Sequence, residues 1–239
     1  MKFFFTLTAL LIGISAYAQD STNLKVNTAF SISSKNFWRG AVYGDNVPSI
    51  QGNVAIVTGN FEIGACGTSP LNGTSLGYGI WMELYASYNI GRFNITVDDY
   101  FFFNEDDHDN DYFNWNRNDT QHLVETRLKY SVDRFNLMGS YVVYASDASV
   151  NALYFEGEYF IIPEFSVLAG YVAGESYLNF YDDAGITHVG IAGNRKIEIT
   201  DTFSIPVKAA LYASPNYENI SELPGLRRNP INLVITLSF

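Results

Sequence analysis

Apolar and polar residues alternate along most of the chain, in runs separated by short turns or by longer loops. An alternation with a period of two is typical of β-strands that have one apolar and one polar face. The runs are close to the 9–11 residues that a tilted membrane strand needs, about one crossing each. The pattern predicts twelve strands, near residues 24–33, 48–57, 60–67, 77–89, 92–103, 121–132, 134–145, 150–161, 164–174, 187–199, 203–213 and 230–239. Long and short connections alternate without a break, so we expect an antiparallel meander whose two ends lie on the short-turn side.

A repeated tripeptide follows five of the short turns and consists of Phe, a polar residue and an aliphatic residue. A further Phe ends the last strand. Short turns with an aromatic ring on one rim, and longer loops on the other, are typical of a transmembrane β-barrel. We therefore expect an aromatic girdle on the periplasmic side, made of Phe61, Phe93, Phe135, Phe165, Phe203 and Phe239.

The two faces of the strands follow from this repeat. If the girdle Phe residues point outward, the outward positions are almost all apolar, and only Asp99 and Arg195 are charged. Pro206 lies within a strand and needs a local irregularity, because proline cannot donate to the ladder. The opposite face collects the charged residues Lys25, Glu62, Glu83, Asp98, Glu125, Arg127, Lys129, Glu156, Glu158, Lys196, Glu198 and Lys208.

Alternation alone does not say which face is inside, because a secreted soluble β-sandwich would turn the same charges outward. Three features favour the membrane: aromatic residues gather at strand ends, turn lengths segregate by rim, and an alternating last strand ends on Phe239. That ending resembles the signal that delivers outer-membrane barrels to their assembly machinery. The sequence thus predicts an all-β fold, a single antiparallel up-and-down barrel over residues 19–239.

The N-terminus and the charge narrow the class further. Residues 1–18 have a basic start, an apolar stretch and the small-x-small site Ala16-Tyr17-Ala18, which predicts a cleaved export signal. The formal net charge of −11 argues against nucleic acid as a partner. The lone Cys66 excludes an internal disulfide. We expect the outer membrane of a Gram-negative bacterium, with lipid and lipopolysaccharide as partners and without a cofactor; the oligomeric state stays open.

One segment carries a family resemblance. Its residues are Ser34, Arg39-Gly40, Pro48, Gln51-Gly52, Gly59, Phe61, Gly64, Gly67 and Ser69, with Phe37 and Trp38 matching more loosely. The segment resembles the opening of a family of bacterial outer-membrane proteins known only as conserved hypothetical proteins. The resemblance implies a barrel and an outer-membrane address, and it brings no established activity.

Arg39 and Gln51 form the most notable polar pair of the predicted lumen. Extending the alternation of the first two strands places both side chains inward, near the loop-side mouth. A guanidinium and an amide there would suit an anionic or hydroxylated solute. Alternatively, Arg39 pairs with a lumen carboxylate such as Glu83 and fixes the first loop.

The lumen charges permit two interpretations, since five basic residues face seven acidic ones. They form either a salt-bridge lattice that fills the barrel or a constriction that selects solutes by charge. Twelve strands give a backbone radius of roughly 12 Å, which long side chains would narrow to a small-solute pore or close. The candidates for selectivity are Arg39, Gln51, Glu83, Glu125, Arg127, Lys129, Glu156, Glu158, Lys196 and Lys208.

Two further groups of residues are candidate sites. Asp107, Asp109 and Asp111 imitate the start of a calcium loop, but Tyr112 stands where such a loop requires Gly. A solvated acidic loop, or one bridged by divalent ions to lipopolysaccharide, fits better. His122 lies on the apolar face at a height suitable for lipid cleavage, without a Ser beside it, so we do not expect an enzyme.

The sequence therefore favours a narrow channel for small polar solutes. The alternative is a closed barrel that serves as a structural or partner-binding protein of the envelope. A lipid-modifying enzyme is a third hypothesis.

Overall fold

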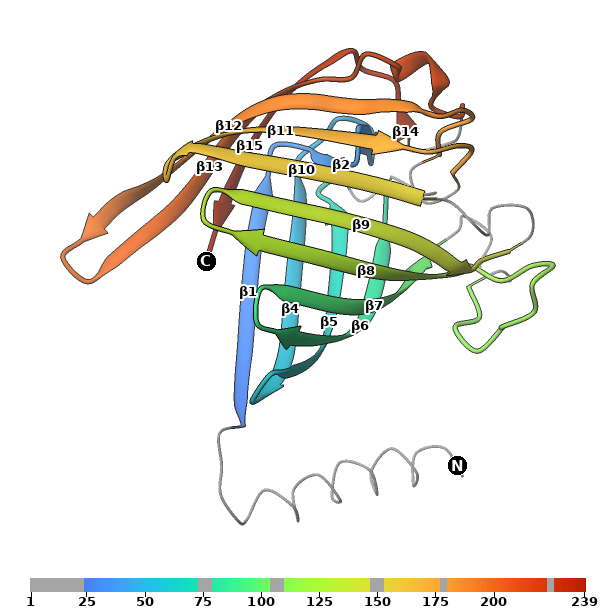
Figure 1. The fold of residues 1–239 in the computed structure, drawn as a ribbon, viewed down its shortest axis with the longest axis horizontal. Coiled ribbons are helices and arrows are strands. Elements are labelled where there is room, and N and C mark those ends of the chain that lie inside the picture. The colour runs from blue at the N-terminus through green and yellow to red at the C-terminus, as the bar shows by residue number, and fades with distance from the viewer. Residues whose placement is uncertain (1–23, 73–78, 104–109, 147–152, 177–179, 223–225) are drawn as a thin grey trace.

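Twelve strands form one closed antiparallel barrel in the computed structural model (Figure 1). The model describes residues 24–72, 79–103, 110–146, 153–176, 180–222 and 226–239, so the predicted export signal lies outside the described residues. Within those ranges, no helix is long and apolar enough to cross a membrane. The barrel strands are β1 (Lys25–Ser33), β4 (Ser49–Thr58), β5 (Phe61–Pro70), β6 (Trp81–Ile90), β7 (Phe93–Phe102), β8 (His122–Val132), β9 (Phe135–Tyr144), β10 (Leu153–Ile162), β11 (Phe165–Val172), β12 (Gly185–Thr200), β13 (Phe203–Ala213) and β15 (Ile231–Ser238).

The predicted fold class and all twelve predicted strands are confirmed. Each strand pairs with its neighbours in sequence, apart from the small elements described below, and the five repeat Phe residues each begin a strand after a short turn. We call the rim with these turns the turn side and the opposite rim the loop side.

The barrel closes where the first and last strands meet. This seam is short, because only Ser31, Ile32 and Ser33 of β1 pair in register with β15. Beyond them, the backbone N–H of Phe239 donates to the carbonyl of Phe30 at 2.8 Å, and that of Phe30 donates back at 3.2 Å. Phe239 therefore helps to close the barrel by joining the last strand to the first.

The outward face is apolar, as predicted. Leu137 on β9, Leu211 on β13 and Leu233 on β15 are each about half exposed, with relative residue exposures of 50%, 45% and 55%. The outward positions pair with one another across the strands, for example Leu211 with Leu233. A closed barrel with an apolar outer wall pairs its backbone groups within the wall, apart from the rims and the turn-side stretches of β1 and β13 beyond the short seam. Such pairing is what a bilayer requires of a spanning structure.

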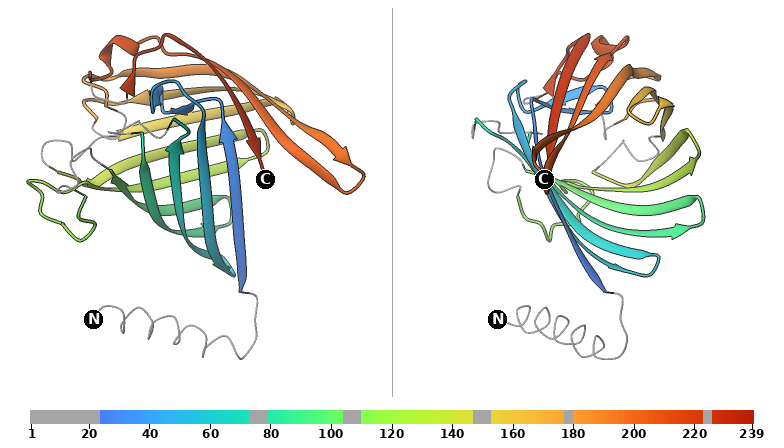
Figure 2. Two further views of the ribbon diagram at one scale, coloured as in Figure 1. Left: turned by 180° about the vertical axis from the view of Figure 1, so that it is seen from behind. Right: turned by 90° about the vertical axis from the view of Figure 1, so that its left-hand side faces the viewer.

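One hairpin projects beyond the turn-side rim. The ladder between β11 and β12 ends at Phe165 and Gly193, whereas β12 and β13 continue to pair as far as Thr200 and Phe203. Figure 2 shows this hairpin extending past the other turns. Pro206 lies on it, one residue before the β13–β15 ladder begins at Val207. In place of the expected irregularity, Pro206 lies on an edge that has no β15 partner, where its missing N–H breaks no β13–β15 hydrogen bond.

A second, small sheet was not predicted. It consists of β2 (Asn36–Trp38), β3 (Ala41–Tyr43) and β14 (Leu226–Arg227), in the order β14-β3-β2. All three residues of β3 are at most 1% exposed. Three-residue strands carry too little alternation to be recognised, and here their burial depends on the barrel that surrounds them.

Candidate functional site: the barrel lumen

A hairpin of the first loop enters the barrel interior. We call it the plug hairpin, residues 36–43, made of β2, the two-residue tip Arg39-Gly40, and β3. Both tip residues have positive φ, 51° for Arg39 and 97° for Gly40. A Cβ on Gly40 would lie 2.6 Å from the backbone oxygen of Thr187, and the Ser214 hydroxyl donates to the Gly40 carbonyl at 3.1 Å. Only glycine fits this position, because both the conformation and the space exclude a side chain.

Arg39 forms a buried ion pair with the barrel wall. Its Nη2 lies 2.9 Å and 3.0 Å from the two carboxylate oxygens of Glu125 on β8. The guanidinium lies over the rings of Trp38 and Tyr154, at 4.6 Å and 4.5 Å from their centroids. Of the two hypotheses for Arg39, pairing with a lumen carboxylate is the one that the geometry shows. The partner is Glu125 instead of Glu83, and Arg39 lies at a hairpin tip instead of on an extension of the first strand.

A second cluster of charges lies beside this pair, on β6, β7 and β8. Arg127 Nη2 is 2.6 Å from Asp98 and 3.8 Å from Glu83. Three carboxylates on adjacent strands are therefore paired with two guanidinium groups. In this part of the lumen the charges form a lattice, the first of the two arrangements considered for them.

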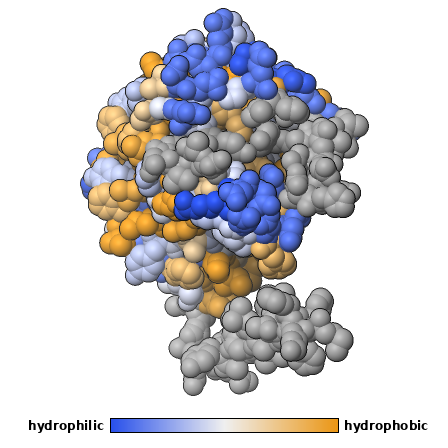
Figure 3. Space-filling view, turned by 90° about the vertical axis from the view of Figure 1, so that its right-hand side faces the viewer, coloured by the Kyte–Doolittle hydropathy of each residue, from blue (hydrophilic) through white to orange (hydrophobic). Residues whose placement is uncertain are grey.

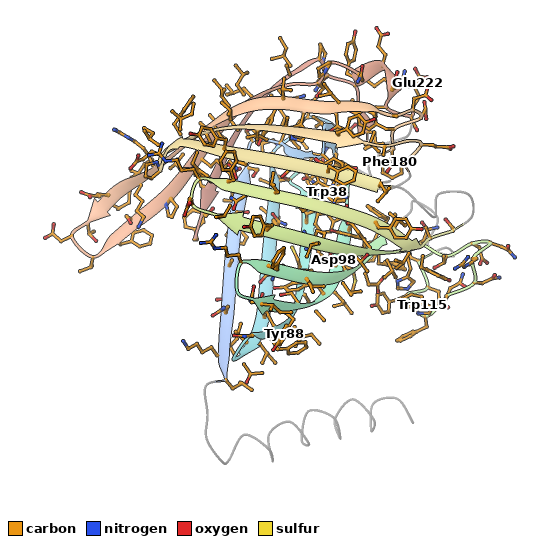
Figure 4. All side chains as sticks on the ribbon, viewed as in Figure 1. Trp38, Tyr88, Asp98, Trp115, Phe180 and Glu222 are labelled. Atoms are coloured by element: carbon orange, nitrogen blue, oxygen red, sulfur yellow. The ribbon has the colours of Figure 1, made fainter. Side chains whose placement is uncertain are left out.

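Aromatic packing fills the loop-side half of the lumen around these charges. Trp38, labelled in Figure 4, contacts Tyr100 and Tyr43 with ring centroids 5.4 Å and 5.8 Å apart. It packs against two buried clusters, one formed by Ala41, Tyr43, Tyr154, Val172, Phe180, Tyr181, Ile220 and Leu226, and the other by Trp81, Tyr100, Phe102, Leu123, Val142 and Ala145. The plug hairpin therefore occludes the barrel on the loop side.

The turn-side half is hollow. A cavity of about 200 Å³, which we call the inner cavity, lies directly beneath the plug hairpin, and Arg39, Glu156, Glu158 and Lys208 are among its lining residues. A cavity of about 580 Å³ lies nearer the rim, and its inward-facing lining includes Asn194, Lys196, Lys208 and Ser238. Lys208 lines both. None of the lysines at 129, 196 and 208 forms an ion pair within the part of the chain that is described.

Acidic and basic residues of the lumen lie mostly on different strands of the barrel wall. The acidic residues Glu83, Asp98, Glu125, Glu156 and Glu158 lie on β6 to β10, together with Arg127 and Lys129. The strands β12, β13 and β1, which lie on the two sides of the seam, carry Lys196, Lys208 and Lys25, with Glu198 in the projecting hairpin. A solute in the inner cavity would meet Glu156 and Glu158 on one wall and Lys208 on the other.

Gln51 takes no part in this cluster. It faces the lumen from β4, and its amide lies 3.1 Å from the Cys66 sulfur. Gln51 and Arg39 form no hydrogen bond with each other, so the predicted polar pair is not brought together. The sequence could not show this, because the extension of β1 ends at Ser33 and the chain then turns into the plug hairpin.

The two outward exceptions have separate explanations. Asp99 pairs with His122 on the next strand, with Nδ1 2.8 Å from the carboxylate, and His122 Nε2 lies 2.6 Å from the Tyr112 carbonyl oxygen. Trp115 stacks on the imidazole at 3.8 Å (Figure 4). The other charged outward residue, Arg195, lies on β12 at the base of the projecting hairpin, near the rim.

This outer contact bears on catalysis and on metal binding. Burial and the Asp99 carboxylate raise the pKa of Tyr112 to about 12, so its hydroxyl stays protonated and donates to Asp99 at 3.2 Å. Both imidazole nitrogens of His122 are engaged, which leaves no free base for a nucleophile. Asp107 and Asp109 lie outside the described residues; Asp111 accepts the backbone N–H of Phe113 at 2.9 Å. Within the described ranges, no cluster of His, Cys, Asp and Glu is placed to hold a metal ion.

Hydrophilic residues gather at the top and centre of the loop-side face, and hydrophobic residues cover much of the wall beside them (Figure 3). The fold thus defines a class, an antiparallel barrel of the transmembrane type with an apolar outer wall and a charged interior.

Comparison with known proteins adds little to this class. No family model and no curated protein matches the chain. A triple-mutant porin of Rhodopseudomonas blastica matches with a TM-score of 0.40 and 9% identity, over 90% of this chain and 100% of that one. An outer-membrane channel from Pseudomonas putida F1 matches with a TM-score of 0.39 and 10% identity, over 91% and 94% of the two chains. TM-scores this low carry no argument, so the barrel rests on its own strand pairing and the family resemblance stays a hypothesis.

Proposed function

We propose that this protein is an outer-membrane barrel of a Gram-negative bacterium that forms a narrow channel for small polar solutes. The plug hairpin closes the channel in the conformation described. The observation that carries the proposal is the contrast within the lumen. Its turn-side half is hollow and lined by lysines without ion-pair partners among the described residues, and the plug hairpin, with the loop residues that pack against it, occludes the rest. A barrel built solely as a rigid pillar has no need of such a charged hollow.

The way the plug hairpin is held supports a gate. One ion pair, Arg39 with Glu125, joins it to the wall, and the Gly40 carbonyl accepts one hydrogen bond from Ser214. Its strands have three residues each and belong to a separate sheet from the barrel. Moving the hairpin would therefore open the lumen without breaking any barrel ladder.

An outer-membrane barrel of this kind would have three partners: lipid, lipopolysaccharide and the barrel-assembly machinery. The apolar outer wall faces lipid, the loop side faces lipopolysaccharide, and the last strand, ending on Phe239, is the segment that the assembly machinery would receive. The six Phe residues at the turn side would form the interfacial girdle.

Conductance in a planar bilayer tests the channel. Gly40→Ala should push the plug hairpin out of its seat, because the new Cβ meets the Thr187 carbonyl. We expect rare or small steps from the natural protein and larger, more frequent ones from Gly40→Ala. The matched control is Gly59→Ala, at a turn-side glycine with φ of 56° and no atom within 4 Å of the added Cβ, and it should conduct like the natural protein.

The closed-barrel alternative is favoured by one observation, the two aromatic clusters that pack around the plug hairpin. It predicts silence from all three proteins. If folded Gly40→Ala and a variant with residues 36–43 replaced by a short Gly-Ser linker both remain silent, the channel proposal is wrong and the structural role stands.

A further inference from the structure

We infer that the inner cavity is a binding site for a small zwitterionic solute, a molecule with one ammonium and one carboxylate group, of the size of a small amino acid. The inference rests on the proposed function and names the class of solute that such a channel would hold. Four observations carry it: two carboxylates without a cationic partner, an ammonium group without an anionic one, a rigid aromatic wall, and the volume.

The acidic side of the cavity is Glu156 and Glu158 on β10. Glu158 accepts hydrogen bonds from the Ser166 hydroxyl at 2.8 Å and from the Asn136 amide at 3.3 Å. Glu156 accepts from the Tyr154 hydroxyl at 2.8 Å, and His188 Nε2 lies 3.8 Å away. Neutral donors therefore orient both carboxylates, and neither forms an ion pair with a Lys or Arg among the described residues. Their negative charge is left for a ligand ammonium.

The basic side is Lys208 on β13, which is separated from β10 by two strands. Lys208 lines the same cavity as Glu156 and Glu158 yet forms no ion pair with either of them. Arg39 borders the cavity from above, and its Nε and Nη1 have no hydrogen-bond partner. A flexible ammonium that stands opposite two carboxylates without reaching them leaves a gap, which a molecule with charges at both ends would bridge.

An aromatic group shapes the third side. Phe37 of the plug hairpin stacks on Tyr212 with centroids 4.2 Å apart and an interplanar angle of 20°. His188 meets both rings edge-on, at 5.7 Å and 5.5 Å. Since the rings pack on one another, they form a fixed wall. The cavity of about 200 Å³ equals the volume of about seven water molecules, which is room for a few non-hydrogen atoms beyond the charged groups of the ligand.

The charges decide between ligand classes. An uncharged polyol would leave both carboxylates and the ammonium without a counter-charge, and a simple anion would meet two carboxylates. A simple cation would leave Lys208 unpaired. Lys208 also lines the wider cavity toward the rim, so the site can be reached from the turn side while the plug hairpin stays in place.

Isothermal titration of the folded natural protein in detergent tests the site. The probes are glycine, L-alanine, L-serine and 4-aminobutyrate, compared at equal ionic strength with propionate, propylamine and erythritol. We expect at least one zwitterion to bind, about tenfold or more tighter than each singly charged or uncharged probe, because two charge-assisted contacts form together. Equal binding of propionate, propylamine or erythritol, or no binding of any zwitterion, would overturn the inference.

Three variants locate the binding. Lys208→Gln and Glu158→Gln each remove one charge and keep a polar side chain, so each should weaken the zwitterion about tenfold or more. Lys196→Gln removes a charge from the rim-side cavity only and should bind as the natural protein does. Unchanged affinity in the first two variants would place the solute elsewhere. Binding without conductance in the bilayer experiment would contradict the proposed channel and support the binding site. Conductance without binding would support the channel and contradict the binding site.

Discussion

The two halves of the lumen are built from the same strands and differ in what fills them. On the loop side, the plug hairpin adds Trp38 and Arg39 to the wall, and the charges of Arg39 and Glu125 are almost completely buried. On the turn side no segment of the described residues enters the lumen, and Lys129, Lys196 and Lys208 remain exposed. The inward positions of the strands thus supply charge at every level. Where the plug hairpin enters, these charges become part of a packed core. Where it does not, on the turn side, they line an open surface.

The largest effect should follow from breaking the packed half. Glu125→Ala leaves the Arg39 guanidinium buried without its counter-charge, which typically costs about 3–5 kcal/mol. Glu158→Ala, in the hollow half, removes a part-buried carboxylate that has no cationic partner and should cost about 1 kcal/mol or less. Urea unfolding of the lipid-reconstituted barrels, followed by heat-modifiable mobility on gels, measures both. Equal losses would show that the two halves are packed alike.

The double variant Arg39→Met/Glu125→Leu sharpens that result. Apolar residues of similar size replace the whole pair, so the loss should be clearly smaller than for Glu125→Ala alone. A loss equal to or above that of the single change would mean that the pair stabilises the plug hairpin beyond mutual neutralisation.

A comparable effect is expected on the outer wall. Leu211→Lys places a charge in the lipid-facing row, opposite Leu233, and a charge at midplane depth on this face should cost about 2–4 kcal/mol. The same unfolding experiment applies, with Lys208→Ala on the inward face of the same strand as the control. A benign Leu211→Lys would mean that the apolar face does not meet lipid.

A smaller effect should separate the outer ion pair from the inner one. His122→Ala leaves the Asp99 carboxylate without its partner beside the apolar wall, which should cost about 1–3 kcal/mol. Asp99→Asn should cost less, because no charge is left behind. Asp99 is partly exposed and Tyr112 still donates to it, so both losses should be below that of Glu125→Ala. The unfolding midpoints of the three variants rank them.

The smallest change in stability belongs to the hollow half. Lys208→Ala should stay within about 0.5 kcal/mol of the natural protein, since Lys208 is exposed and without an ion pair. Introduced together with Gly40→Ala, it should shift ion preference toward cations, because a positive lumen charge is removed. Reversal potentials in a salt gradient measure this shift, with Gly40→Ala alone as the reference. An unchanged potential would remove Lys208 from the selectivity residues.

The strands and their faces were predictable because each carries its own signal. Alternation places Leu137 outward and Glu158 inward without knowledge of any neighbour, and the Phe repeats mark the turns. The packing of the loops was not predictable in this way. The partner of Arg39 depends on where a hairpin of three-residue strands is inserted, which local periodicity does not encode. Two signals were present in the sequence. One is the Arg39-Gly40 pair that follows Trp38, and the other is the lone outward Asp99, two positions from Phe101, which pairs with His122 on the neighbouring strand.

The seam between β1 and β15 has a consequence for how the molecule comes into being. Ser33 and Thr236 join their hydroxyls across it at 2.7 Å although 203 positions separate them along the chain. Contacts this distant in sequence are the slowest to form, since the entropy of closing the chain is lost before they are gained. Every hairpin can form between strands that are neighbours in the sequence, but the barrel closes only when β1 pairs with β15. Until Phe239 pairs with Phe30, the protein is a curved sheet with two unpaired strand edges. The longer this open state lasts, the greater its risk of aggregation.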